Sequence, residues 1–443
     1  MAVSPMYMSA VEDRYRNATP RSRALFERAT HSLPGGNTRT TIYHQPYPFY
    51  FDHGVGCRIY DVDGNEWVDF INNYTSLIHG HAPPGVVAAV QRQAARGFSA
   101  AAPSELEIEL AEVIHARLPS VELLRFTNSG TEATMLAMRA ARAFTGRTKI
   151  AKFEGAYHGT HDYAAVDVSA GGAIGAGTQT SNAGIPPAVA ASMVSLPYNN
   201  REAVERILTA QRNEIAAVII EPVQGAGGIV VARDGFLDFL HELTQRLGIL
   251  LIFDEVIAFR LGYGGAQGYF GVRPDLTTLG KIIGGGFAVG AFGGRADIMA
   301  RFDPREINHI GHGGTFNANP VTMAAGLATL AELTPAAFER LAQLGAELKQ
   351  KLGDLFAELD LPVQVNQIGS LFNLHFTDAE VSDYPSVLAG NRQILKDLYT
   401  ATLNHGVVFT GRGMGCLSTP MTSAELDRFV GAVRNGLADL GVA

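Results

Sequence analysis

The stretch Leu251-Ile252-Phe253-Asp254-Glu255-Val256 is an apolar run that leads into two carboxylates. Such a run predicts a buried parallel strand whose carboxyl end faces a site. Further along, Thr277-Thr278-Leu279-Gly280-Lys281 delivers one lysine just before a glycine-rich segment. A crowded lysine can form a Schiff base, and a strand-end aspartate can pair with a protonated pyridine nitrogen. Asp254 and Lys281 therefore suggest pyridoxal 5'-phosphate (PLP), although a buried ion pair without chemistry fits these two residues equally well.

The composition is that of an ordinary globular protein. The 443 residues are 18% charged and 47% hydrophobic, which predicts a large core, most simply in two packed domains. The net charge of −8 argues against non-specific nucleic-acid binding. No apolar run predicts a membrane span or a signal peptide. Only Cys57 and Cys416 are cysteines, a usage that favours a reducing, cytoplasmic location.

Strands and helices are predicted to alternate through the middle of the chain. The pattern predicts strands at 123–126, 149–153, 216–222 and 249–254, and helices at 132–144 and 235–247. This alternation is typical of an α/β fold with a mainly parallel sheet flanked by helices. Ligands of such sheets lie beyond the carboxyl ends of the strands. The residues that fall there are Asn128, Tyr157, Glu221 and Asp254.

The two ends of the chain have a different pattern. We expect one helix over 12–32, an antiparallel meander over 49–70, and an α+β segment at the C-terminus that includes a helix over 386–405. These patterns predict an N-terminal segment 1–75 and a C-terminal domain 331–443, which together form a small domain, and a large domain 76–330. The residues 163–192 are rich in Gly, Ala, Ser and Thr. They predict a mobile lid, or alternatively an insertion with no role.

A second group of candidates lies where two other strands end. Ser129-Gly130-Thr131 joins a strand to a helix, so its amides and hydroxyls could hold a phosphate. A plain helix cap explains the same residues. Tyr157 could stack on a cofactor ring, or it could be an ordinary core or surface residue. His158 and His161 have helical spacing but lack the further donors that a metal site needs, so no metal is expected.

The order of these parts resembles that of the fold-type I, class III PLP-dependent aminotransferases. The resemblance covers about residues 30–330 and is carried by six stretches. These are Asn128-Ser129-Gly130-Thr131-Glu132-Ala133, Tyr157-His158-Gly159, Glu221-Pro222-Val223-Gln224-Gly225, Asp254-Glu255-Val256, Thr278-Leu279-Gly280-Lys281 and Gly314-Thr315-Phe316.

The resemblance implies a role for each matching residue. Lys281 is expected to form the Schiff base and to shuttle the proton, and Asp254 to keep the pyridine nitrogen protonated. Amino transfer would pass through pyridoxamine phosphate. The other implied contacts are Val256 and Tyr157 on the two ring faces, Ser129, Gly130 and Thr131 at the phosphate, His158, Glu221 and Gln224 around the ring, and Thr315 at the phosphate of the partner subunit in a homodimer.

Two subgroups of this family match the chain. Glutamate-1-semialdehyde 2,1-aminomutases are similar through Gly264–Tyr269, Gly290–Arg295 and the long Gly/Ser/Thr loop. The β-amino-acid (β-phenylalanine) aminotransferases are similar through Tyr74-Thr75, Gln224-Gly225 and Gly314–Asn317. The chain departs from the mutase pattern after Glu221-Pro222-Val223 and at Thr315–Asn319, which favours the second subgroup.

Two arginines are candidates for binding the carboxylates of the substrates. Arg39 matches the substrate-carboxylate arginine of both subgroups, and a guanidinium fork suits a carboxylate. Arg412 lies in a glycine-rich loop from which it could swing toward a second carboxylate. Five apolar or aromatic residues could line the substrate pocket, although each of them could instead be packed in the protein core. These residues are Tyr43, Tyr74, Phe316, Phe409 and Met414.

We therefore predict a PLP-dependent transaminase that moves the amino group of a β-amino acid to 2-oxoglutarate or pyruvate by a ping-pong mechanism. The alternatives are the semialdehyde aminomutase, a broad-specificity ω-amine transaminase, and a PLP-binding protein without catalysis. Small amino and keto acids are the expected partners, with no nucleic acid and no membrane.

Overall fold

The computed structural model describes residues 3–166 and 183–442. The chain divides into two compact units. One unit comprises Pro84–Glu339 and Val381–Val387, and the other comprises Met1–Pro83, Arg340–Glu380 and Leu388–Ala443. The predicted lid at 163–192 lies largely outside the described residues, and its described end contains a short helix, α7 (Pro187–Ala191), where a loop was expected.

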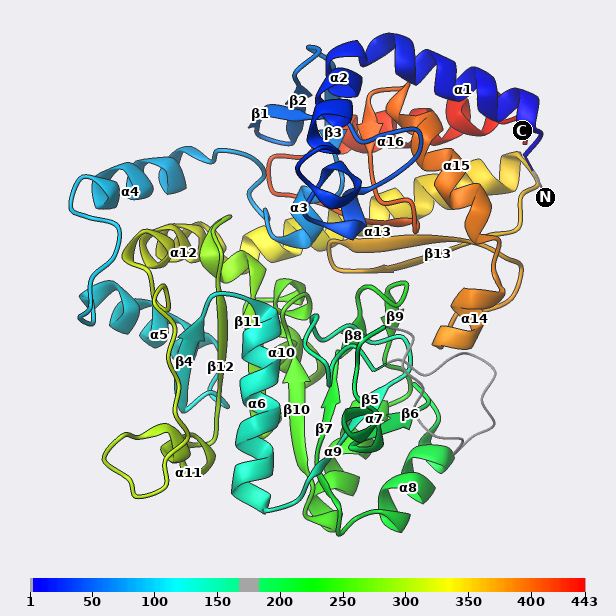
Figure 1. Cartoon of the computed structure of the whole chain (residues 1–443). Helices are drawn as coiled ribbons and strands as arrows, with labels where there is room; N and C mark the ends of the chain where they lie inside the picture. The colour runs from blue at the N-terminus through cyan, green and yellow to red at the C-terminus, as the bar shows by residue number, and fades with distance from the viewer. Residues whose placement is uncertain (1–2, 167–182, 443) are drawn as a thin grey trace. The chain divides into compact units, whose positions relative to one another are not determined.

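The unit that begins at Pro84 is built on a seven-stranded sheet (Figure 1). Its order is β4 (Leu123–Thr127), β12 (Gly290–Gly294), β11 (Leu276–Gly280), β10 (Leu250–Asp254), β7 (Ile215–Ile220), β5 (Lys149–Phe153) and β6 (Met193–Leu196). The strands from β11 to β6 are parallel, and β12 runs antiparallel to both of its neighbours. The prediction of a mainly parallel α/β sheet is confirmed.

Helices cover both faces of this sheet because its strands are apolar on both sides. On β10, Leu250 and Ile252 belong to one core cluster, whereas Leu251 and Phe253 belong to another. The first cluster includes the alanine-rich side of α6 (Gly130–Thr145), and the second includes α8 (Arg201–Ala210) and α9 (Phe236–Leu247). A strand that is buried on both faces explains the unbroken apolar run of the sequence.

The glycine-rich strand β12 was not predicted, since glycine is depleted in strands. The close approach of neighbouring backbones explains these glycines. A Cβ added at Gly290 would lie 2.1 Å from the carbonyl oxygen of Ser129 and 2.3 Å from Oγ1 of Thr127. A Cβ at Gly294 would lie 2.1 Å from the carbonyl oxygen of Asp275. β12 therefore packs against the end of β4, where the predicted phosphate turn begins.

Gly290→Ala is expected to destabilise the protein by about 1–3 kcal/mol, the usual cost of overpacking a tight site. Gly353→Ala is the matched control, because no atom lies within 4 Å of a Cβ at that position of α13 (Pro335–Glu358). It should stabilise by about 0.5–1 kcal/mol through helix propensity. Chemical denaturation of both variants measures this difference, and equal stabilities would contradict it.

This unit contains further helices and turns. They are α4 (Pro84–Ala94), α5 (Glu105–Arg117), α10 (Gly265–Phe270), α11 (Ala296–Met299) and α12 (Pro320–Glu332), with the 3-10 turns η3 (Ala258–Leu261), η4 (Lys281–Gly284) and η5 (Ala300–Phe302). A small hairpin pairs β8 (Val223–Gln224) with β9 (Val230–Val231).

The second unit has two small sheets. The antiparallel meander β1 (Phe51–Val55), β2 (Arg58–Asp61) and β3 (Glu66–Asp69) is present as predicted, and β15 (Val407–Val408) joins it parallel to β3. The other sheet contains β13 (Val363–Ile368), β14 (Leu371–Phe376) and β16 (Met414–Cys416). The helical part includes α1 (Pro5–Ala18), α2 (Pro20–Ala29), α3 (Asn72–Thr75), α13 from Arg340 onward, α15 (Arg392–Leu403) and α16 (Ser423–Asp439), with the 3-10 turns η1 (Pro34–Gly36) and η2 (Thr40–Ile42).

Two predicted helices are divided. The helix expected over 12–32 is α1 (Pro5–Ala18) followed by α2 (Pro20–Ala29), because Pro20 cannot donate the hydrogen bond that continuity needs. The helix expected over 386–405 is α14 (Tyr384–Ala389) followed by α15, whose N-cap Asn391 accepts a hydrogen bond from the amide of Ile394.

Within the described part of the chain, no single helix has both the length and the apolar composition of a membrane span. Among the described helices, the bent pair α12 and α13 meets that test when the two helices are taken together.

Candidate active site

Strand register brings the predicted residues of the first unit to one edge of its sheet. Asp254 on β10 pairs with Thr278 on β11, whose next residues lead to Lys281. Phe253 pairs with Ile220 of β7, so Glu221 also emerges at this edge. Because β4 and β11 both run antiparallel to β12, they run in the same direction, and the predicted phosphate turn after β4 emerges at this edge too. Parallel strand ends thus gather an acid pair, a lysine and a helix N-terminus.

The carboxylate of Asp254 is buried, and both of its oxygens take part in hydrogen bonds. Its Oδ2 lies 2.7 Å from Nδ1 of His158. Its Oδ1 accepts hydrogen bonds from Oγ1 of Thr278 at 3.0 Å and from the amide of Val256 at 3.1 Å. Contacts from the His158 loop, from β11 and from the backbone just after Asp254 fix the direction of this carboxylate.

His158 explains part of that arrangement. Burial lowers the pKa of this histidine, so the neutral ring prevails near neutral pH. A carboxylate can only accept, so Nδ1 carries the proton and donates to Asp254. Its Nε2 is buried and has no hydrogen-bond partner among the described residues. Sequence reasoning placed His158 near the cofactor only through the family motif, and its contact with Asp254 was missed.

Glu221 is a buried carboxyl with an unusual pKa. Burial, with a further contribution from nearby Asp254, raises the pKa of Glu221 to about 8. Its Oε2 accepts a hydrogen bond from the amide of Tyr157 at 2.9 Å, and its Oε1 accepts one from the amide of Gly225 at 3.2 Å. Glu221, just after β7, therefore ties the Tyr157 loop to the turn between β8 and β9.

The raised pKa predicts a pH-dependent stability. Between about pH 4.5 and pH 8, Glu221 is protonated in the folded protein but ionised in the unfolded chain. Its contribution is therefore complete below the unfolded pKa and is lost as pH rises through the folded pKa. Glu221→Gln should remove this dependence in the cofactor-free protein, so that the variant gains stability relative to the unmodified protein as pH rises.

Thermal unfolding of the cofactor-free protein from pH 5 to pH 9 measures that effect. Glu242→Gln, at an exposed position of α9, is the matched control and should follow the unmodified protein across the range. Parallel pH profiles for all three proteins would contradict the assignment of the dependence to Glu221.

The second carboxylate of the opening stretch has a structural task. Glu255 is fully buried, and burial raises its pKa to about 7. It accepts hydrogen bonds from the amides of Ala266 and Gln267 at 2.5 and 3.2 Å, and from Nε2 of Gln267 at 2.9 Å. Glu255 thereby anchors the chain beyond β10 to the start of α10.

The predicted phosphate turn begins α6. Ser129 is the N-cap, and its Oγ accepts a hydrogen bond from the amide of Glu132, as in the plain capping alternative. The amide of Ala133 donates to the carbonyl of Ser129. The amides of Gly130 and Thr131 lie ahead of the first intrahelical bond, where an anion is favoured. Capping by Ser129 is therefore compatible with an anion at this turn.

Close packing links this turn to the lysine. A Cβ at Gly130 would lie 3.0 Å from Cγ2 of Val256, and one at Gly280 would lie 3.4 Å from Cγ1 of the same valine. Lys281 follows with φ 52°, a conformation that a side chain tolerates only when its surroundings hold it there. Val256 thus lies between the phosphate turn and the residue before Lys281.

Three further predicted residues lie on the loops around this edge. Gln224 is buried, and its Nε2 donates to the carbonyl of Glu154 at 2.7 Å, whereas its Oε1 has no hydrogen-bond partner among the described residues. Tyr157 is 52% exposed. Thr315 is exposed on a turn whose Asn317 accepts a hydrogen bond from Nδ2 of Asn128 at 2.8 Å. That last contact was missed, since no local pattern connects residues so far apart in sequence.

The predicted substrate residues of the second unit are exposed or half-buried. Arg39 is exposed, and its Nη1 donates to Oδ1 of Asn73 at 2.8 Å. The hydroxyl of Tyr74 donates to the carbonyl of Thr41. Arg412 is exposed on the turn between β15 and β16.

The candidate pocket residues differ in their burial. Phe409 is buried against Phe429, with ring centroids 5.5 Å apart, so core packing accounts for it. Met414 is also buried. Phe316, in the first unit, is 61% exposed.

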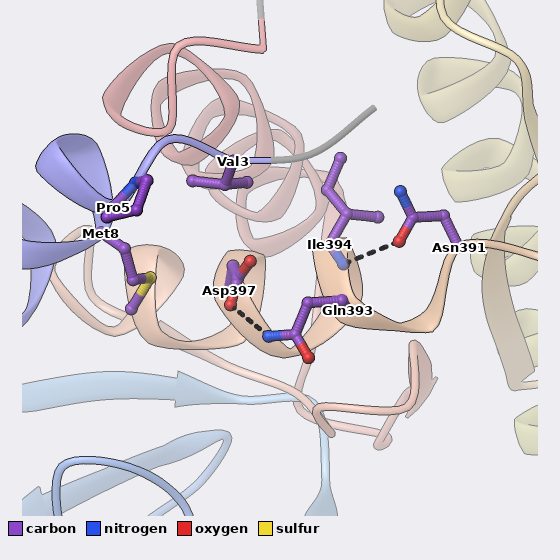
Figure 2. Close-up of a pocket in the computed structure, with 7 residues that line it drawn as sticks. All are labelled: Val3, Pro5, Met8, Asn391, Gln393, Ile394 and Asp397. Carbon is purple, nitrogen blue, oxygen red and sulfur yellow. Dashed lines mark hydrogen bonds between the residues drawn. The ribbon is translucent and has the colours of Figure 1, made fainter.

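A hollow of about 400 Å³ lies in the second unit and contains none of the predicted site residues (Figure 2). Nε2 of Gln393 donates to Oδ1 of Asp397 at 2.8 Å in its wall. Its lining residues are Val3, Pro5, Met8, Asn391, Gln393, Ile394 and Asp397. Across the described residues, no group of three or more His, Cys, Asp or Glu side chains is arranged to hold a metal ion.

The family model of the class III aminotransferases matches residues 41–428. The chain belongs to this family. It is 41% identical over 423 residues to a glutamate-1-semialdehyde 2,1-aminomutase of Methanothermobacter thermautotrophicus, covering 95% of this chain and 99% of that protein. It is 40% identical over 428 residues to a β-phenylalanine transaminase of Variovorax paradoxus, covering 96% and 95%.

Solved structures agree with this assignment. An ω-transaminase from Sphaerobacter thermophilus superposes with a TM-score of 0.92 at 48% identity, covering 95% of this chain and 98% of that one. A transaminase solved with PLP bound gives 0.89 at 40% identity, with the same coverage. The predictions of a fold-type I enzyme, of aminotransferase activity and of PLP as cofactor are confirmed.

The residues of the first unit fit this cofactor. The buried carboxylate of Asp254 suits a protonated pyridine nitrogen, the N-terminus of α6 suits a phosphate, and Lys281 has the primary amine that a Schiff base needs. Buried Nε2 of His158 and Oε1 of Gln224 are polar atoms without partners among the described residues, as expected beside a site for a polar ligand.

Proposed function

We propose that this aminotransferase moves the amino group of a β-amino acid, of the β-phenylalanine type, to 2-oxoglutarate or pyruvate. The observation that carries this proposal is the departure from the aminomutase pattern at Gln224–Ala226 and Thr315–Asn319. Two of these positions have specific contacts, Gln224 with Glu154 and Asn317 with Asn128. The likeness to a β-phenylalanine transaminase at 40% identity supports the same choice.

The cofactor, when bound, supplies an electron sink that lets a proton leave the substrate carbon. We propose that Lys281 holds the cofactor covalently at rest and then moves that proton through Nζ. Asp254 would keep the pyridine nitrogen protonated, and His158 would fix the direction of the Asp254 carboxylate. Gly130 and Thr131 would bind the phosphate through their amides, and Ser129 would close the turn.

The remaining residues would complete the cofactor and substrate sites. Tyr157 and Val256 would enclose the ring, and Glu221 and Gln224 would lie beside it. Thr315 would reach the phosphate of a partner subunit in a homodimer. Arg39 would bind the carboxylate of the amino donor, Arg412 that of a dicarboxylate acceptor, and Tyr74 and Phe316 would flank the side chain. The buried thiols of Cys57 and Cys416 fit a cytoplasmic location.

The second candidate is the semialdehyde aminomutase, favoured by 41% identity to such an enzyme over 99% of its length. The two functions differ in their need for an acceptor. We expect the protein to convert β-phenylalanine only when 2-oxoglutarate or pyruvate is added, and to release the corresponding amino acid. Product formation from glutamate-1-semialdehyde without an acceptor, together with inactivity on β-phenylalanine, would favour the mutase instead.

A further inference from the structure

The segment α3 has positive φ values, which its residue types rarely adopt. Asn72, Asn73, Tyr74 and Thr75 have φ values of 47°, 47°, 54° and 74°. With ψ values of 56° and 52°, Asn73 and Tyr74 are in the left-handed helical region. Asparagine tolerates this region, but tyrosine and β-branched threonine do so rarely. Consecutive left-handed residues that lack glycine persist only where the surroundings fix them, and they cluster at functional sites.

Buried polar contacts fix the start of this turn. Oδ1 of Asp69 accepts hydrogen bonds from the amides of Ile71 and Asn72 at 2.7 and 2.9 Å. Nδ2 of Asn72 donates to the carbonyls of Asp69 and Cys416, both at 3.0 Å. Oδ2 of Asp69 lies 2.8 Å from Nε2 of His81. The backbone is thus held in an unfavourable conformation by a network with no evident task of its own.

The turn directs its next two side chains at the loop that carries Arg39. Oδ1 of Asn73 accepts a hydrogen bond from Nη1 of Arg39 at 2.8 Å, and the hydroxyl of Tyr74 donates to the carbonyl of Thr41. The amide of Arg39 donates to Oδ1 of Asn37 at 2.9 Å. Contacts at residues 39 and 41 therefore hold both the backbone and the guanidinium of this loop.

The contact with Asn73 leaves one edge of the Arg39 guanidinium available for a carboxylate. A guanidinium binds a carboxylate bidentately with two neighbouring N–H groups. Asn73 takes Nη1. The edge formed by Nε and Nη2 makes no hydrogen bond to any described residue and has the spacing of a carboxylate. The neutral amide oxygen of Asn73 thus orients the guanidinium of Arg39. Because this oxygen carries no negative charge, it does not compete with a substrate carboxylate for the guanidinium.

We propose that Asn73 is a positioning residue that orients Arg39 and thereby sets the preference of the enzyme for substrates with a carboxylate. This inference rests on the proposed role of Arg39. The left-handed turn gives Asn73 its direction, and Tyr74 holds the loop that carries Arg39.

Asn73→Gly tests this role, because glycine accepts the left-handed backbone while losing the amide. The holoenzyme is mixed with β-phenylalanine, or with 1-phenylethylamine, which lacks the carboxylate, and the half-reaction is followed by the absorbance of the bound cofactor. The apparent Kd for β-phenylalanine should rise about 5- to 10-fold, as expected for the loss of one exposed hydrogen bond, with an unchanged maximal rate. Neither constant should change for 1-phenylethylamine.

Two controls separate positioning from a structural role. Ser76→Ala removes a 3.0 Å bond from Ser76 Oγ to the carbonyl of Asn73 and should leave both amines unaffected. In the Arg39→Ala background, Asn73→Gly should cause no further loss for β-phenylalanine, since the two residues act as a unit. The thermal midpoint of Asn73→Gly should equal or exceed that of the unmodified protein.

Equal losses for the two amines, or additive losses in the double variant, would overturn the proposal. The proposed function has a separate failure, namely that the unmodified protein does not react with β-phenylalanine. Asn73 is then judged on the reverse half-reaction with pyruvate against acetophenone, a ketone without a carboxylate. A selective loss with pyruvate would still support the positioning role, and no selective loss would refute it.

Discussion

Replacing Lys281 with alanine should lower transamination by at least about 10³-fold. The lysine is expected both to hold the cofactor covalently and to move the proton, and general acid–base catalysis by one positioned group contributes about 10²- to 10⁴-fold. The variant should still bind some PLP, because the acid at β10 and the N-terminus of α6 are unchanged. Activity with a saturating amino donor measures the first effect. Cofactor content of the native protein, compared with the content after borohydride reduction and denaturation, separates bound PLP from covalently attached PLP.

Lys281→Arg is the matched control. It keeps the positive charge at the same backbone position, where φ is 52°, but cannot form a Schiff base. We expect it to be as inactive as Lys281→Ala and to retain no cofactor after denaturation. Substantial turnover by either variant would show that another residue performs the proton transfer.

Asp254→Asn should reduce the rate by about 10²- to 10³-fold, the usual effect of removing one preorganised electrostatic group. Asparagine has nearly the shape of aspartate: its oxygen can still accept from Thr278 and from the amide of Val256, and its Nδ2 can donate to Nδ1 of His158 in the other ring tautomer. The loss should therefore appear in the rate of the half-reaction rather than in the folding of the protein. Single-turnover kinetics with a saturating donor, together with the thermal midpoint, separate the two.

Thr278→Val is the control for that variant. It removes the 3.0 Å hydrogen bond to Oδ1 of Asp254 but leaves the carboxylate charge and two other contacts. A rate within about 10-fold of the unmodified protein is expected, because the carboxylate keeps its charge and its other two contacts still hold its direction. If Thr278→Val were as slow as Asp254→Asn, the orientation of the Asp254 carboxylate, and not its charge, would account for its effect on the rate.

Much of the fold and of the cofactor site could be predicted because the patterns involved are local. The two-sided burial of β10 makes its sequence apolar throughout, and its carboxyl end is marked by Asp254. Parallel strands then bring their ends together, whatever lies between them. Local patterns fail where packing decides: β12 is a strand of glycines because the ends of β4 and β11 leave no room for side chains.

The sequence by itself determined the family, the cofactor and the order of the residues proposed to bind it, because each is expressed in short motifs at strand ends. Tertiary structure alone decided which side chains hold those residues. His158 against Asp254, Asn128 against Asn317, and the left-handed turn that aims Asn73 at Arg39 each join segments distant in sequence. Such pairings and backbone conformations are imposed by the packing of the whole unit, and no local pattern of residues specifies them.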